Sequence, residues 1–238
     1  MNKRKILLLL GLVATGLLVI GLISMSNIGI VKVEATQWTG LNSPQGVYIG
    51  DYDNDGLNDI AISEGSGGRV TVYKSDGTTI IKQWTGLSNP AGVAIGDYDN
   101  GGLNDIAIAE NWASQFTVYK SDGTTIIKQW TGVGEAWGVS IGDYDNDGLN
   151  DIALTVHGYY GWLKVYKSDG TTIIKQWTGS ATRVAIGDYN NDGLNDIAFE
   201  TLGNIMVYKS DGTTIIKQWT GSVVAIGDYN NDGLNDIA

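Results

Sequence analysis

The sequence predicts an all-β fold, a β-propeller of four-stranded antiparallel blades, and three observations lead to this prediction. One acidic, glycine-containing segment occurs five times, at intervals of 46, 46, 45 and 40 residues, beginning at Asp51, Asp97, Asp143, Asp188 and Asp228. Periods in this range are typical of propeller blades. Each full interval contains four short apolar runs separated by turn residues. Beyond the N-terminal stretch, no segment keeps a helical period.

The N-terminal stretch, residues 1–35, differs from the rest of the chain. Lys3, Arg4 and Lys5 precede an almost wholly apolar stretch at residues 6–25, which we expect to form a hydrophobic helix. Small residues around Ala35 fit a signal-peptidase site, so residues 1–35 are interpreted as a secretory signal. An uncleaved membrane anchor through residues 6–25 is the alternative. Either way we expect the remainder to be exported, because the basic residues stay inside, and to be secreted or held at the extracellular face of the cell membrane.

The charge of the chain is concentrated in a few loops. The formal net charge is −11, and most of the acidic residues lie in the five repeated segments. A nucleic-acid-binding surface needs clustered positive charge, so we expect no nucleic-acid partner. The chain has no cysteine, so we expect packing and bound metal, rather than disulfides, to stabilise an exported domain of this sequence.

Each repeat begins with a first strand that leads into the acidic loop. The predicted first strands are residues 46–49, 92–95, 138–141, 184–186 and 224–226. A second strand leaves the loop at residues 59–62, 105–108, 151–154 and 196–199. A variable connection leads to a third strand such as residues 70–74, and a fourth strand such as residues 79–84 completes the blade.

The third and fourth strands are predicted to form a hairpin. An Asp-Gly pair separates them at Asp76-Gly77, Asp122-Gly123, Asp169-Gly170 and Asp211-Gly212, which favours a two-residue type I′ turn. Lys82 and Gln83 on the fourth strand suit an exposed outer edge. The fourth strands end in tryptophans that we expect to pack between neighbouring blades: Trp84, Trp130, Trp177 and Trp219.

The repeats of residues 36–238 form four complete blades, approximately residues 46–84, 92–130, 137–177 and 183–219, and a partial fifth at residues 223–238. Residues 31–38 resemble a fourth strand, because Gln37-Trp38-Thr39-Gly40 repeats the sequence at Gln83-Trp84. That strand could close a five-bladed ring by pairing with the last blade. A truncated arc of a longer propeller is the other reading, and both remain open at this point.

The acidic loops are predicted to bind Ca²⁺, at up to five sites. Oxygen ligands at loop positions 1, 3, 5 and 9, a backbone carbonyl at position 7 and a glycine at position 6 suit a hard cation, because unscreened carboxylates this close would repel. An EF-hand is excluded, since Ile62 and its equivalents occupy position 12, where that loop needs an acid. The candidate ligands are Asp51, Asp53, Asp55, Leu57 and Asp59 (loop 1); Asp97, Asp99, Leu103 and Asp105 (loop 2); Asp143, Asp145, Asp147, Leu149 and Asp151 (loop 3); Asp188, Asn190, Asp192, Leu194 and Asp196 (loop 4); and Asp228, Asn230, Asp232, Leu234 and Asp236 (loop 5).

The segment at residues 49–62, Ile-Gly-Asp-Tyr-Asp-Asn-Asp-Gly-Leu-Asn-Asp-Ile-Ala-Ile, resembles the FG-GAP / VCBS repeat of integrin-α-like β-propellers. In that family the motif lies between strands one and two of a blade and binds Ca²⁺. The resemblance covers nearly all of residues 36–238. The chain lacks the Phe-Gly and Gly-Ala-Pro signatures of integrin sequences, which places it nearer the VCBS-like branch, and it has fewer repeats than the seven blades usual there.

The loops differ in the number of carboxylates that they offer. Loops 1 and 3 have four, and loops 4 and 5 have three with an asparagine at position 3. In loop 2, Gly101 replaces the carboxylate at position 5. Because ligand charge tunes calcium affinity, we expect loops 1 and 3 to bind most tightly and loop 2 most weakly.

The opposite face of the blades, formed by the connections between strands two and three and between successive blades, varies among repeats. It carries the candidate partner-binding residues Arg69, Trp112, Trp137, His157, Tyr159, Tyr160, Trp162 and Arg183. Exposed aromatic residues suit protein or glycan ligands. We therefore interpret the protein as a cell-surface binding or adhesion module in which calcium is structural. A lectin-like carbohydrate-binding propeller is the alternative, and a polysaccharide-degrading enzyme is less favoured, because His157 is the one histidine and cysteine is absent.

Overall fold

The computed structural model describes residues 6–10, 18–25, 31–222, 225–227 and 235–237, and every regular element in these ranges is a β-strand. Their centre is four four-stranded antiparallel sheets, as the sequence predicts. Blade 1 contains β4 (Pro44–Gly50), β5 (Asp59–Glu64), β6 (Arg69–Tyr73) and β7 (Ile80–Thr85). Blade 2 contains β8 (Pro90–Gly96), β9 (Asp105–Glu110), β10 (Gln115–Tyr119) and β11 (Ile126–Thr131). Blade 3 contains β12 (Glu135–Gly142), β13 (Asp151–His157), β14 (Trp162–Tyr166) and β15 (Ile173–Thr178), and blade 4 contains β16 (Val184–Gly187), β17 (Asp196–Thr201), β18 (Asn204–Tyr208) and β19 (Ile215–Thr220).

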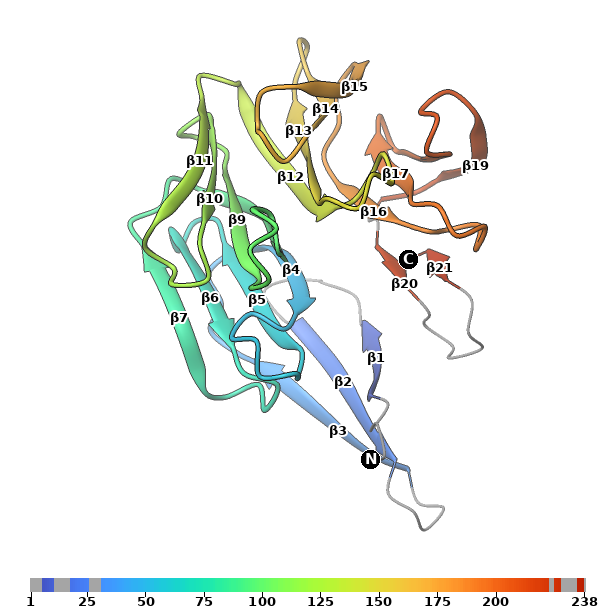
Figure 1. Ribbon diagram of the computed structural model, residues 1–238. Helices are drawn as coiled ribbons and strands as arrows, with labels where there is room; N and C mark the ends of the chain where they lie inside the picture. Colours follow the sequence, from blue (N-terminus) through green and yellow to red (C-terminus); the bar gives the residue numbers. More distant parts are fainter. Residues whose placement is uncertain (1–5, 11–17, 26–30, 223–224, 228–234, 238) are drawn as a thin grey trace.

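The sheets follow one another around a common centre, with the first strand of each blade innermost and the fourth outermost (Figure 1). Each first strand packs on the next, from β4 through β8 and β12 to β16. Second strands β5 and β9 are buried at every residue, whereas β7, β11, β15 and β19 are largely half-buried or exposed. The decrease in burial from the second to the fourth strand follows the composition of the strands, because Ile-Ala-Ile runs lie inside and Ile-Ile-Lys-Gln-Trp runs lie at the edge.

Glycines in the first strands allow the blades to approach closely. A Cβ on Gly92 would lie 2.3 Å from the carbonyl oxygen of Trp137 in the next blade. A buried hydroxyl links blades at the same level, since Ser63 Oγ donates to the carbonyl oxygen of Ala91 at 2.9 Å. Thr155 Oγ1 makes the equivalent bond to Thr182. The inner strands are therefore joined by backbone-level contacts as well as by side-chain packing.

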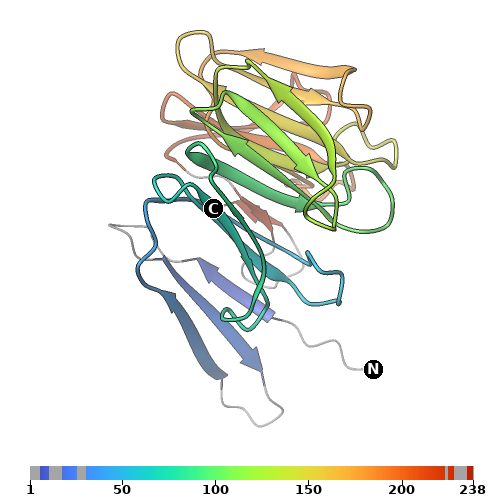
Figure 2. The ribbon, with the colours of Figure 1, turned by 90° about the vertical axis from the view of Figure 1, so that its left-hand side faces the viewer.

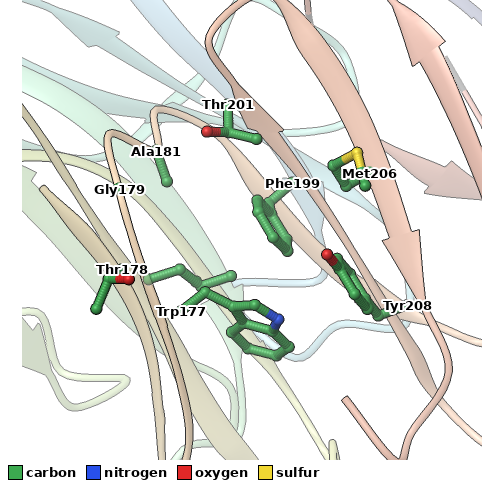
Figure 3. A pocket seen from close by; sticks show the side chains of 9 residues that line it. Trp177, Thr178, Gly179, Ala181, Phe199, Thr201, Met206 and Tyr208 are labelled. Atoms are coloured by element: carbon green, nitrogen blue, oxygen red, sulfur yellow. The ribbon is translucent and has the colours of Figure 1, made fainter. Parts of the chain in front are cut away.

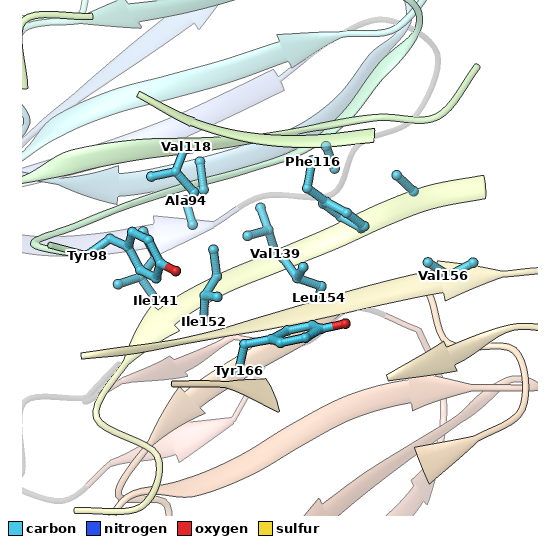
Figure 4. Packing of buried hydrophobic residues seen from close by; sticks show 13 residues of the cluster. Ala94, Tyr98, Phe116, Val118, Val139, Ile141, Ile152, Leu154, Val156 and Tyr166 are labelled. Carbon is cyan, nitrogen blue, oxygen red and sulfur yellow. The ribbon is translucent and has the colours of Figure 1, made fainter. Parts of the chain in front are cut away.

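The hydrophobic core is divided among the junctions between blades. Between blades 2 and 3, Phe116 and Val118 of β10 face Leu154 of β13 and Val139 of β12 (Figure 4). Blades stacked in this way appear as layers when the molecule is turned by 90° (Figure 2). Trp130, at the end of β11, lies on this cluster, 5.6 Å from the ring of Tyr166 in blade 3. The predicted inter-blade role of the tryptophans is confirmed.

Two corrections concern the ends of the chain. Where a helix was expected over residues 6–25, the structure places strands β1 (Ile6–Leu10) and β2 (Leu18–Met25), with residues 11–17 outside the described ranges. A continuous apolar run has no periodicity that distinguishes a helix from a buried strand. In the described part of the chain, no helix has the length and apolar character needed to cross a membrane. Strand β3 (Val31–Trp38) pairs with β2 rather than with the last blade, so it does not close a ring there.

The partial fifth blade is present as the strand pair β20 (Ile226–Gly227) and β21 (Asp236–Ile237). Strand β20 packs on β16, which extends the series of first strands by one. At the other end, Trp38 of β3 is buried against Ile60 and Ile62 of blade 1. Trp38 thus packs on blade 1 as Trp84 packs on blade 2.

The predicted hairpins form, but their turns are not of type I′. Gly77 has a φ of +70°, whereas Asp76 is not among the residues with positive φ, and a type I′ turn needs both. The carboxylate of Asp76 instead accepts the backbone N–H groups of Thr78 and Thr79 at 2.7 and 2.8 Å. These Asx-type hydrogen bonds stabilise a four-residue loop in which the Lys74 N–H donates to the Thr79 carbonyl. The same bonds recur at Asp122, Asp169 and Asp211.

Candidate functional site

Each described acidic loop is shaped by hydrogen bonds to its own carboxylates. In loop 1, Asp51 accepts the backbone N–H groups of Asp55 and Gly56 at 3.0 and 2.9 Å. Asn54 and Gly56 adopt left-handed conformations, with φ of +60° and +87°. Asparagine and glycine are the residues that tolerate this region best. Loops 2, 3 and 4 repeat the first-position bonds at Asp97, Asp143 and Asp188.

The ninth position of each of loops 1 to 4 is a buried carboxylate. Asp59 is 1% exposed, and its Oδ2 accepts the N–H groups of Tyr52 and Asp53 at 3.0 and 3.2 Å. Burial raises the pKa of Asp59 above its ordinary value, and at the equivalent position in loop 3 it raises the pKa of Asp151 to about 6. A buried carboxylate of this kind is unfavourable when ionised unless a cation neutralises it.

Three carboxylates converge in each of loops 1, 2 and 3. Oxygens of Asp51, Asp53 and Asp59 lie within 4.8 Å of one another, and the same holds for the equivalent residues of loops 2 and 3. These triads are Asp51, Asp53 and Asp59; Asp97, Asp99 and Asp105; and Asp143, Asp145 and Asp151. Calcium takes carboxylate oxygens at 2.3–2.6 Å, so oxygens at this mutual separation suit one ion.

One oxygen of the first triad has no protein partner. Asp59 Oδ1 is buried and accepts no hydrogen bond, although its companion Oδ2 accepts two. Asp145 Oδ1 in loop 3 is also buried without a hydrogen-bond partner. Buried acceptors in proteins are nearly always satisfied, so these oxygens fit the coordination of a cation. The carboxylates of these loops are therefore suited to holding a divalent ion.

The fifth-position carboxylates of loops 1 and 3 are not part of these triads. Asp55 Oδ1 accepts the N–H of Leu57 at 2.9 Å and Oδ2 contacts Lys74 Nζ at 3.2 Å, so Asp55 is not part of the triad. Asp147 makes the same two contacts, with Leu149 and Lys167. The expected fourth carboxylate of loops 1 and 3 thus lies at the periphery of the cluster.

Loop 2 differs from its neighbours in two respects. Gly101 leaves a space, and a cavity of about 80 Å³ there is lined by Asp99, Gly101, Leu103, Asp105, Lys120 and Ser121. In addition, Asp105 Oδ1 accepts the backbone N–H of Ser121 at 3.1 Å, whereas the equivalent atom of Asp59 is free of hydrogen bonds. The hydrogen bond from Ser121 occupies an oxygen of the loop 2 triad, and Gly101 removes the peripheral carboxylate that Asp55 and Asp147 supply in loops 1 and 3.

Loops 4 and 5 complete the series of predicted sites. In loop 4, Asn190 replaces one carboxylate, and its Oδ1 accepts the N–H of Asp192 at 2.9 Å. Asp196 is 1% exposed and holds the N–H groups of Tyr189 and Asn190, as Asp59 holds its neighbours. In loop 5, Asp228, Asn230, Asp232 and Leu234 and the side chain of Asp236 lie outside the described residues.

A lysine accompanies each described loop, and the sequence reasoning missed it. Lys74, at the end of the third strand of blade 1, places Nζ 2.6 Å from Asp53 Oδ2. Lys120, Lys167 and Lys209 contact loops 2, 3 and 4 in the same way. The recurrence of Tyr-Lys-Ser-Asp-Gly after every third strand was the available signal. These ammonium groups offset part of the negative charge of each loop.

Asparagines connect each loop to the next. Asn104 Nδ2, in loop 2, donates to the carbonyl oxygen of Asp51 at 2.6 Å, and its backbone N–H donates to Asn54 Oδ1 at 3.0 Å. The pattern repeats along the series with Asn150, Asn195 and Asn235 as donors. Because Asp51 and Asn54 belong to the turn that shapes loop 1, the geometry of one loop is held in part by the next.

On the variable face, the two candidate arginines are engaged in ion pairs. Arg69 binds the buried Glu64, with Nη2 2.9 Å from Oε2. Arg183 Nη1 lies 2.8 Å from Glu200 Oε2 and 3.2 Å from Ser222 Oγ. Arg69 is held at one end of blade 1, and Arg183 is held at one end of blade 4. Both arginines are therefore less available to a partner than expected.

The candidate aromatic residues gather on blade 3. Trp137 at β12 lies 5.8 Å from the ring of His157, and His157 Nδ1 lies 2.8 Å from Glu135 Oε2. Trp162 begins β14 and has Lys164 Nζ 4.3 Å from its ring centroid. In the connection between β13 and β14, Tyr159 and Tyr160 are 93% and 88% exposed, with their rings in edge-to-face contact. Trp112, on blade 2, is 73% exposed.

Known proteins resemble this chain in both sequence and fold. Residues 51–108 and 143–199 match the model of the FG-GAP-like repeat. No curated protein matches the sequence significantly. Among solved structures, BBS1N in complex with ARL6DN, from crystals soaked with lead, has a TM-score of 0.57 at 11% identity over 89% of this chain and 68% of that one. Sqt1 of Saccharomyces cerevisiae has a TM-score of 0.57 at 9% identity over 93% and 64%, and hydrazine synthase of Kuenenia stuttgartiensis 0.54 at 14% identity over 80% and 53%.

The four described blades, packed through their first strands, define an all-β protein of the propeller class. Identities this low establish the fold alone. The acidic loop between strands one and two, repeated from blade to blade, agrees with the sequence match: the chain contains FG-GAP-like repeats, as the resemblance in the sequence implied.

Proposed function

We propose that the protein is an exported propeller whose acidic loops bind Ca²⁺ as structural ions and whose variable face binds a protein partner. The unpartnered, buried Asp59 Oδ1 within the triad of loop 1 is the single observation that carries the calcium assignment. A bound cation would supply the charge that the buried ninth-position carboxylates lack, and would tie strand one to strand two in each blade. Up to five sites follow from the five loops, with loop 2 weakest.

Support for a binding module comes from the aromatic residues of blade 3. Tyr159 and Tyr160 are almost fully exposed although both carry large apolar surfaces. Tyrosine and tryptophan are enriched at the centres of protein interfaces, because they bury much area at a low entropic cost. These side chains lie in the connection between β13 and β14, and connections carried by a packed sheet are where binding residues concentrate. One protein of similar fold, BBS1N, is itself seen in a complex with a second protein, ARL6DN.

A glycan ligand is the second candidate, because exposed tyrosine and tryptophan rings also stack on sugars. We favour a binding role over catalysis, since His157 is held between Glu135 and Trp137 and the triad carboxylates are assigned to metal. Export rests on the basic residues 3–5 and the apolar residues 6–25, and a cell-surface or secreted location is part of the proposal.

Parallel screening of calcium-loaded protein against an array of extracellular protein domains and an array of glycans tests this function. We expect binding to a protein domain that is lost in Tyr159→Ala/Tyr160→Ala and kept in Leu202→Ala, a matched change at an 84% exposed side chain in the connection of blade 4. Binding to glycans alone would favour the lectin reading. Equal binding by both variants would remove blade 3 from the partner site.

A further inference from the structure

A cavity of about 170 Å³ lies between blades 3 and 4. Its walls come from β14, β15, β17 and β18 and from the chain that joins the two blades. In Figure 3, Gly179 and Ala181 lie across the cavity from Met206 and Tyr208, with Trp177 and Phe199 between them. The cavity is distinct from the acidic loops and from the exposed aromatic residues of blade 3.

The junctions between the preceding blades show what fills this space elsewhere. After each fourth strand, one backbone N–H donates to the carbonyl that precedes the third strand of the same blade. The donors are Leu87 in blade 1, Val133 in blade 2 and Gly179 in blade 3, at 2.9, 3.1 and 2.9 Å. Leu87 and Val133 pack on the core of their junctions beside Trp84 and Trp130. In blade 3 the donor is a glycine, and the residue three positions after Trp177 is Ser180, where Leu87 and Val133 follow Trp84 and Trp130 at the same spacing, so no aliphatic side chain follows the fourth strand here.

The lining of the cavity is mostly apolar and aromatic, with the two threonines Thr178 and Thr201 at its wall. Trp177 lies 5.4 Å from the ring of Phe199 and 5.6 Å from that of Tyr208. The hydroxyl of Thr201 donates to the carbonyl oxygen of Ser180 at 2.7 Å, and none of the nine lining side chains has a buried polar atom without a partner. The rings of Trp177, Phe199 and Tyr208 nevertheless form much of the wall, which suits an occupant with an apolar, aromatic surface.

We propose that this cavity is a binding site for a neutral molecule with a single aromatic ring. The cavity is partly open to solvent, and its volume is close to the ~150 Å³ of an engineered, closed apolar cavity that takes up benzene. An aromatic ring would replace the aliphatic side chain found at the two preceding junctions. It would also make the edge-to-face contacts with Trp177, Phe199 and Tyr208 that aromatic quadrupoles favour. The site does not depend on bound calcium or on the partner face.

Methyl NMR of the full chain with benzene as the probe tests the site. The sequence has three methionines, and Met206 lines the cavity, so its ¹³C-labelled methyl resonance reports occupancy while those of Met1 and Met25 serve as references. We expect a saturable ring-current shift of the Met206 resonance and no comparable shift of the references. Absence of a Met206 shift up to the solubility limit of benzene would overturn the proposal, with or without any variant.

Matched variants then locate the effect. Ala181→Leu places a side chain toward the empty space, so it should abolish the benzene-induced shift and leave Tm unchanged or raised. Ala136→Leu is the same change at a fully buried alanine of the filled junction between blades 2 and 3, and should lower Tm without affecting the shift. If Ala181→Leu lowers Tm as much as Ala136→Leu does, or keeps the benzene response, the proposed site is wrong.

Discussion

Replacing Asp151 by asparagine should stabilise the calcium-free protein at neutral pH. Asp151 is 1% exposed, and its Oδ2 accepts the N–H groups of Tyr144 and Asp145 at 3.0 and 3.3 Å. An asparagine amide oxygen is able to keep both hydrogen bonds. Burial, with the nearby charge of Asp145, raises the pKa of Asp151 from 3.8 to about 6. Ionised Asp151 is therefore a destabilising charge unless a cation is bound.

The magnitude follows from the pKa difference. The folded protein binds the Asp151 proton more tightly than the unfolded chain does, so the associated stability is fully present below about pH 4 and is lost as the pH rises through about 6. The interval from 3.8 to about 6 corresponds to about 3 kcal/mol, which is an upper bound for the effect at pH 7. Asp151→Asn removes this pH-dependent loss in EDTA, whereas added Ca²⁺ should stabilise the wild type more than the variant.

Urea unfolding of both proteins in EDTA, from about pH 4 to about pH 8, measures the effect. We expect the free-energy difference to grow in favour of Asp151→Asn as the pH rises, and to reverse when Ca²⁺ is added. Asp169→Asn is the control, and it should lower the free energy of unfolding at neutral pH. Hydrogen bonds from Thr172 lower the pKa of Asp169, so its carboxylate stabilises the turn at that pH. A difference between wild type and Asp151→Asn that is constant with pH would refute the reasoning.

Three other predictions test the loops and the junctions. In calorimetric titration with Ca²⁺, Asp51→Ala should remove more binding heat than Asp97→Ala, because loop 2 offers fewer free oxygens; an unchanged signal in Asp51→Ala would contradict the calcium assignment. Asn104→Ala should lower the free energy of unfolding by about 1 kcal/mol through loss of its hydrogen bond to Asp51, and no change in urea denaturation would show that this bond contributes nothing. Gly170→Ala should lower Tm more than Gly148→Ala. Both glycines have positive φ, but a Cβ on Gly170 would also lie 2.8–2.9 Å from side-chain atoms of Lys128 and Tyr98. Equal Tm values for the two variants would argue against this contact.

The strands and blades follow from local information in the sequence. Short apolar runs, the recurring Asp-Gly pairs and the metal-like spacing at Asp51 each act within a dozen residues, so the four blades and the first two strands of the fifth are recognisable before any tertiary contact is known. Trp84 was also assignable, because its recurrence at one place in each repeat indicates a shared packing role.

Contacts between residues of different repeats or different strands were harder to predict from the sequence. The hydrogen bond from Asn104 to Asp51 spans 53 positions, and the pairing of Lys74 with Asp53 depends on how two strands of one blade meet. The turn at Asp76 was misjudged because its carboxylate binds the N–H groups of Thr78 and Thr79, which stabilises a longer loop than the Asp-Gly pair suggests. Arg69 was taken for a partner residue, but the buried Glu64, which lies directly opposite it on the neighbouring strand β5, engages it.

Thermal unfolding of the full chain in EDTA and in excess Ca²⁺ tests the central claim most directly. A site saturated at about 100 times its Kd adds about 2.7 kcal/mol, which corresponds to roughly 5–10 °C in Tm for a domain of this size. We expect Ca²⁺ to raise Tm by at least that amount, and Mg²⁺, which demands a tighter octahedral geometry, to raise it less. An identical Tm in EDTA and in Ca²⁺ would contradict the assignment of the acidic loops as structural calcium sites.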